Sequence, residues 1–227
     1  MCFSASASFG AGVVLSVIGV ASIKKAQSPS QNAFASIPLL FAVQQITEGF
    51  VWLSLSNPAY AILQQVATYN FLFFAQVVWP AWVPFAILKL EPKESRRMPG
   101  KILIGIGALV SLYLAYCLLN FSVEAKIVGS HISYIQNYPA SIANYCGFLY
   151  IVATIVPPFF SHIKRMWMLG TTILISYIIT GIFYADYIVS VWCFFASIIS
   201  ISVFAILYEL KNVSEQTTSE TSKRAIT

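Results

Sequence analysis

The chain has 227 residues, of which 58% are hydrophobic and only 9% charged, and its mean hydropathy is +0.77. Soluble domains carry about 25% charged residues, so this composition argues against a water-soluble domain and predicts an integral membrane protein. The net charge is +5, but the basic residues lie in short loops between apolar segments. That placement is typical of membrane topology and not of a nucleic-acid-binding patch.

Seven apolar segments are each long enough to cross a bilayer, which takes about 20 residues. In chain order they are Phe3–Ile23, Phe34–Leu55, Thr68–Leu88, Ile102–Leu119, Ala140–Ser161, Trp167–Ala185 and Ile188–Tyr208. The first basic residues follow the first segment, so we expect no cleavable signal peptide. We predict an all-α integral membrane seven-helix bundle over residues 1–211, followed by a polar, disordered cytoplasmic tail at 212–227.

The basic residues test this count. Twelve of the thirteen lysines and arginines fall after odd-numbered segments, and only Lys126 lies in a loop of the other side. Cytoplasmic loops are enriched in lysine and arginine. The pattern therefore predicts an N-terminus outside and a C-terminus in the cytoplasm.

Short sequence matches between segments one to three and five to seven suggest an internal repeat, for example Phe85–Leu88 against Phe204–Leu207. Two parallel three-helix units joined by an inverting fourth helix occur among transporters. Apolar sequences also match by chance, so both interpretations stay open.

Glu48 is the acidic residue that lies well inside a predicted span, roughly 10 Å below the outer surface. Gln44 shares its helix face, and Gln76 of the third span falls at a similar depth. Charged groups at such depth usually face the bundle interior or a water-filled cavity. The three residues predict a polar binding layer, the alternative being a hydrogen-bonded structural Glu48.

The third span contains Trp79, Pro80, Trp82 and Pro84. Proline removes a backbone hydrogen bond and kinks a helix, and interrupted helices form the binding sites of many transporters. We therefore expect Pro80, Trp79 and Trp82 to contribute to the binding site, the alternative being a static kink with packed tryptophans.

The sequence argues against several chemistries. Cys2, Cys117, Cys146 and Cys193 show no CxxC spacing, so neither disulfides nor a thiolate metal site is indicated, although disulfides stay open. Two histidines are too few for a typical zinc hydrolase site. We predict no metal, no cofactor and no catalytic residue.

The opening Met1–Phe9, the Gln44-Gln45 pair with Glu48-Gly49, and Trp79-Pro80 resemble an uncharacterised family of small bacterial seven-helix membrane proteins that open with Met-Cys-Phe-Ser-Ala. The resemblance implies a stand-alone protein of the bacterial inner membrane and carries over no activity.

Three functions follow as hypotheses. The first is transport or binding of a small solute or ion within the helix bundle, based on the polar layer and the broken third helix. The second is a heptahelical sensor or partner-binding protein that acts through its tail. The third is a membrane enzyme acting on lipid or quinone. The lipid bilayer is the one partner that the sequence predicts directly, and the oligomeric state is not predicted.

Overall fold

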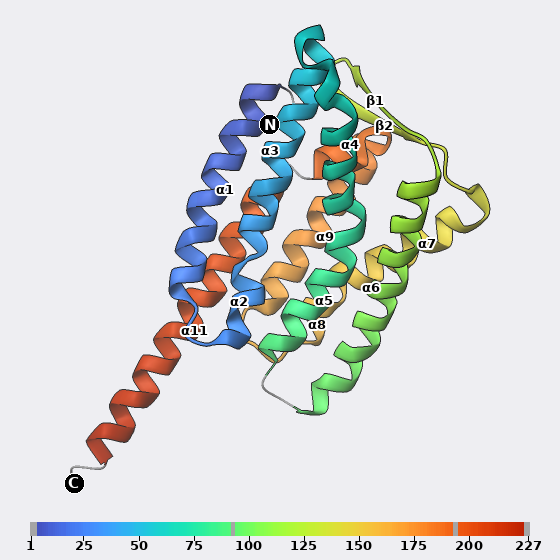
Figure 1. Cartoon of the computed structure of the whole chain (residues 1–227). Helices are drawn as coiled ribbons and strands as arrows, with labels where there is room; N and C mark the ends of the chain where they lie inside the picture. The colour runs from blue at the N-terminus through green and yellow to red at the C-terminus, as the bar shows by residue number, and fades with distance from the viewer. Residues whose placement is uncertain (1–3, 92–93, 193–194, 225–227) are drawn as a thin grey trace.

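The computed structural model describes residues 4–91, 94–192 and 195–224 (Figure 1). These residues form long helices that run side by side, with one small β-hairpin at an end of the bundle. The main helices are α1 (Ala5–Lys25), α2 (Pro29–Ala35), α3 (Ile37–Ser56), α4 (Gln64–Leu72), α5 (Trp79–Leu90), α6 (Glu94–Asn120), α7 (Ala140–Ile155), α8 (Pro157–Phe160), α9 (Met166–Phe183), α10 (Ile188–Trp192) and α11 (Ala196–Arg224). The largely helical architecture predicted from composition is confirmed.

Five of these helical segments are long and apolar enough to cross a membrane. Two of the five are composite: α2 and α3 together cover Pro29–Ser56, and the third segment covers Pro58–Leu90. The apolar part of α7 is shorter, at Tyr145–Ile155, and α10 and α11 are inclined to each other by 43°. The chain therefore carries several membrane-length helices, while the predicted count of seven stays a prediction.

The two ends of the bundle differ in charge. The end of α1, the end of α5 and the starts of α6 and α9 lie at one end, and the start of α1 and the hairpin lie at the other (Figure 1). At the first end Glu209 of α11 pairs with Arg165 at 3.1 Å and with Lys164 at 3.6 Å. There the buried carboxylate of Glu91 also accepts hydrogen bonds from Ser161 Oγ and the His162 amide, both at 2.9 Å.

The loop between α6 and α7 contains two short strands that the sequence did not predict, β1 (Val123–Val128) and β2 (His131–Gln136). They pair antiparallel, with Val128 opposite His131. Gly129 takes φ +62°, as the first position of a two-residue type II′ turn requires. β-Branched residues flanking a glycine turn are a hairpin signal, although these strands are too short to form a long apolar segment.

The third membrane segment departs from α-helical geometry just before the predicted Trp79–Pro84 stretch, which itself lies in α5. A π-helical turn, η2, covers Phe73–Val78 and leads into α5 at Trp79. Two carbonyl groups of this turn accept side-chain hydrogen bonds from neighbouring helices: Tyr150 Oη donates to Ala75 O at 2.6 Å, and Ser111 Oγ donates to Val77 O at 2.7 Å. Neighbouring helices thus satisfy backbone groups that the break exposes, as an apolar bilayer demands.

Helix α1 packs closely along α3 through small residues. Ser8, Gly12 and Gly19 of α1 are buried there. A Cβ at Gly12 would lie 2.6 Å from Ile46, and one at Gly19 would lie 2.5 Å from Leu39. Small residues that let two backbones approach are the usual basis of helix packing in lipid.

The candidate repeat finds no support in this packing. Helices α7 and α9, the counterparts of α1 and α3, share only a brief contact, whereas α1 and α3 pack along their length. Helix α11 is continuous through Arg224, so the backbone of residues 212–224 extends α11. The division between a bundle at 1–211 and a disordered tail at 212–227 stays a prediction.

Candidate functional site

A cavity of about 610 Å³ lies inside the bundle. Its walls come from α3, η2, α5, α6, α7, α9, α10 and α11, together with the end of the hairpin. Of the residues that the structure describes around it, none is charged. Small-molecule sites are commonly of this size, mostly apolar, with a few placed polar groups.

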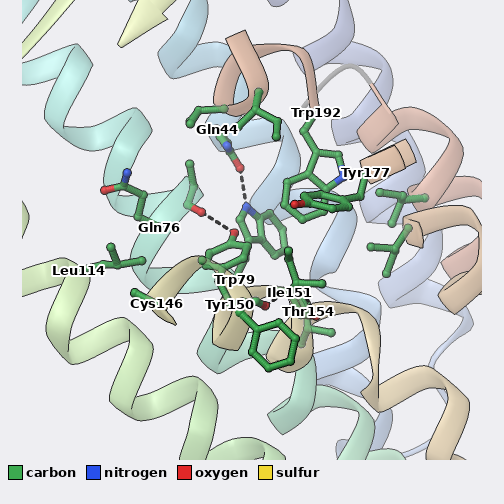
Figure 2. Close-up of a pocket in the computed structure, with 18 of the residues that line it drawn as sticks. Gln44, Gln76, Trp79, Leu114, Cys146, Tyr150, Ile151, Thr154, Tyr177 and Trp192 are labelled. Atoms are coloured by element: carbon green, nitrogen blue, oxygen red, sulfur yellow. Dashed lines mark hydrogen bonds between the residues drawn. The ribbon is translucent and has the colours of Figure 1, made fainter. Parts of the chain in front are cut away.

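The polar part of the cavity lies toward the hairpin. Gln76, in the π-helical turn, donates from Nε2 to Gln136 Oε1 at 2.8 Å and accepts from Tyr138 Oη at 3.1 Å. Burial raises the pKa of Tyr138, so its hydroxyl stays protonated as a donor. Trp79 Nε1 donates to Gln44 Oε1 at 2.7 Å (Figure 2). The predicted residues Gln44, Gln76 and Trp79 therefore do meet at one cavity.

The remaining walls are aromatic and aliphatic. The rings of Tyr150 and Tyr177 lie 6.0 and 5.5 Å from the Trp192 ring (Figure 2). Toward the opposite end the lining is mostly aliphatic, with Val83 in α5 and Leu169 near the start of α9, together with Thr154 of α7. A molecule that fills the space would meet hydrogen-bonding groups at the hairpin end and hydrocarbon at the basic end.

Glu48 is fully buried but does not line this cavity within the described part of the chain. Ser190 Oγ of α10 donates to Glu48 Oε1 at 2.6 Å, and Gln45 Nε2 donates to Glu48 Oε2 at 3.3 Å. We call Glu48, Gln45 and Ser190 the Glu48 cluster. The cluster links α3 to α10 by a hydrogen bond. Three residues of α10 line the cavity: Ile188, Val189 and Trp192.

Two further predicted binding residues lie behind the cavity wall. Pro80 is buried, and its carbonyl oxygen, which Pro84 leaves without its usual helical donor, lies directly against Gly107 of α6. Trp82 Nε1 donates to Ala33 O at 3.1 Å, which ties α5 to α2. The structure therefore places Pro80 and Trp82 in helix packing, and their predicted role in binding stays untested.

The cysteines are only partly described. Cys117 and Cys146 are both buried and free, and Cys146 lines the cavity. Cys2 and Cys193 lie outside the described residues. In the described part of the chain no group of three or more His, Cys, Asp or Glu side chains is arranged to hold a metal ion.

The residues that sequence reasoning missed come from the hairpin and α7. Gln136 and Tyr138 follow β2, and Tyr150 lies on a helix with no charged residue to mark it. Their partners are 60 or more residues away in the chain. The one available signal was the polar pair Gln136-Asn137 next to Tyr138-Pro139, directly before an apolar segment.

Comparison with known proteins gives a family without a known activity. No curated protein and no solved structure matches the chain. A family model described as "Family of unknown function (DUF6629)" matches residues 1–219. The chain belongs to this family.

Proposed function

We propose that this membrane protein binds an uncharged, largely apolar small molecule in the cavity, as a carrier of small solutes does. The observation that carries the proposal is the lining: about 610 Å³ of space with aromatic and aliphatic walls and no charged side chain among the described residues. The proposal includes the predicted topology of seven spans in the bacterial inner membrane, with the N-terminus outside and the C-terminus in the cytoplasm. The basic residues gathered at one end of the bundle support that orientation.

The lining favours a neutral solute over an ion. A charge that leaves water for an apolar site is costly unless an opposite charge or several hydrogen bonds receive it. The buried carboxylate of α3, Glu48, lies outside the cavity lining and already accepts hydrogen bonds from Ser190 and Gln45. In this proposal Gln44, Gln76 and Trp79 contact the ligand, and Glu48 is a positioning residue that holds α10.

The test uses three probes that share one alkyl chain and differ in the head group: a hydroxyl, a carboxylate or an ammonium group. Binding to the full chain in lipid nanodiscs is measured by native mass spectrometry. We expect the alcohol to bind and the two charged probes to bind far more weakly. Equal binding of a charged probe, or no binding of the alcohol, would overturn the proposal.

Gln76→Leu tests the polar end, because it removes the amide group that donates to Gln136 and accepts from Tyr138. We expect affinity for the alcohol to fall by about tenfold, the equivalent of about 1.4 kcal/mol. Gln65→Leu is the matched control, because Gln65 is exposed in α4 of the same segment. Deletion of residues 214–227 should leave binding unchanged, whereas a sensor that works through its tail would lose signalling.

A further inference from the structure

We infer that the ligand enters the cavity sideways from the lipid bilayer, through a mouth at Gly147 and Phe148 of α7, and is therefore a membrane-dissolved amphiphile. This inference rests on the proposed function and adds the source of the ligand and its route. Three observations on α7 support it: the exposure of lining residues, the chemistry of the rim, and the free space at Gly147.

The cavity reaches the surface of the bundle at α7. Phe148 lines the cavity and is also 65% exposed, and its neighbour Gly147 lines the cavity and is exposed as well. Buried Cys146 precedes them in the chain. Residues that belong both to a cavity lining and to the outer surface mark the place where the cavity opens.

The rim of this mouth is apolar. The exposed side chains of α7 around Gly147 are Tyr145, Phe148 and Leu149. Neither α6 from Ile102 to Asn120 nor α7 contains a charged residue. Large exposed apolar surfaces on a membrane helix face hydrocarbon, so the mouth opens toward lipid tails and not toward water.

Gly147 keeps the mouth open. A Cβ added at this position would meet no atom within 4 Å. A larger side chain at Gly147 would therefore begin in free space at the opening and would not push against neighbouring atoms. The other polar and apolar features of the cavity fit the route, because an amphiphile that enters here can place its head group at Gln76 and Gln136 and its tail toward Val83 and Leu169.

The chemical class follows from the route and the lining together. A molecule that dissolves in the bilayer, carries no net charge and presents one hydrogen-bonding head group satisfies both ends of the cavity. The volume of about 610 Å³ suits a molecule with one chain or one ring system. An uncharged single-tail lipid and a small isoprenoid-like quinone share this chemistry.

The experiment measures the rate of photolabelling in liposomes that contain the full chain. One probe is a fatty alcohol with a diazirine in its chain, dissolved in the bilayer, and the other is a water-soluble, uncharged diazirine alcohol added from outside. Peptide mass spectrometry follows the labelling of Trp79, Tyr150 and Trp192 over time. We expect the bilayer probe to label these residues faster than the water-soluble probe.

Gly147→Leu should slow labelling by the bilayer probe several-fold, because its side chain closes the mouth. Gly105→Leu is the matched control: Gly105 is an exposed glycine of α6 whose Cβ would also meet nothing within 4 Å, and it does not line the cavity. Phe148→Ala enlarges the mouth and should speed labelling, which keeps the test informative if Gly147→Leu fails to fold.

Three results overturn the inference. If neither Gly147→Leu nor Phe148→Ala changes the rate, or if the water-soluble probe labels the cavity faster, the ligand does not enter through this mouth, while the proposed binding site still stands. If neither probe labels the cavity in the unaltered protein, the proposed function fails as well.

Discussion

Gln44 and Glu48 lie one turn apart on the same face of α3, and both are almost completely buried, yet their surroundings differ. Gln44 accepts a hydrogen bond from Trp79 and lines the cavity. Glu48 is enclosed by Gln45 and Ser190. A buried polar residue in a membrane helix is therefore not a ligand-binding residue by depth alone. What decides is whether the cavity reaches the side chain, as it does at Gln44 and does not at Glu48.

The largest effect tests the Glu48 cluster. Glu48→Ala leaves the buried hydroxyl of Ser190 without its acceptor and removes packed atoms, so we expect a loss of about 3 kcal/mol in unfolding free energy. Glu48→Gln should lose less, because its amide oxygen still accepts from Ser190. Unfolding by detergent titration measures both.

The control for this pair is Thr47→Ala on the same helix, because the Thr47 hydroxyl bonds only to Val43 O of its own helix in the described contacts. If Glu48→Ala keeps full stability but no longer binds the alcohol, then Glu48 contacts the ligand, as the sequence predicted, and the comparison with Gln44 is wrong.

A smaller effect tests the cavity wall. Tyr150→Phe removes the hydrogen bond to Ala75 O and should cost about 1 kcal/mol of stability. Because the freed carbonyl then faces the cavity, binding of the alcohol should not weaken. Tyr145→Phe is the control, since Tyr145 is exposed on the same helix. Weaker alcohol binding in Tyr150→Phe would show that the hydroxyl itself holds the ligand.

The smallest effect concerns the hairpin that carries Gln136. His131 stacks on Tyr187 with ring centroids 4.8 Å apart, which joins the hairpin to the α9–α10 turn. Burial lowers the pKa of His131 below its usual value, so the folded state binds a proton less readily than the unfolded state. The folded state is therefore favoured while His131 is neutral, and the unfolding free energy decreases as the pH falls below the usual pKa of histidine.

We expect the melting temperature to fall slightly between about pH 7.5 and about pH 5, and His131→Phe to remove most of this dependence while keeping the ring stack. His162→Phe, at the opposite end of the bundle, is the control for histidine titration elsewhere. A pH dependence that survives in His131→Phe and disappears in His162→Phe would place the sensitive contact at the basic end instead.

The fold was largely readable from the sequence because lipid imposes simple rules on it. Apolar length predicted the helices, and the prolines of the third segment predicted a kink, whereas the structure has a π-helical turn at Phe73–Val78, just before Pro80. The hairpin was not predicted, because twelve residues of alternating pattern carry a weaker signal than a long apolar run. Part of the site was predicted, because the positions of Gln44 and Gln76 within their spans placed them at similar depth. The residues from the hairpin and α7 were not predicted.

What the sequence by itself determined is the set of elements and the gathering of basic residues at one end of the bundle, since both follow from local composition. Only the tertiary structure decided which polar residues face space. Gln76 meets Gln136, and Glu48 meets Ser190, across separations of 60 and 142 residues. Helical periodicity shows which residues share a face of a helix. Packing decides which other helix lies opposite that face. That is why Gln44 lines the cavity while Glu48 lies in the Glu48 cluster.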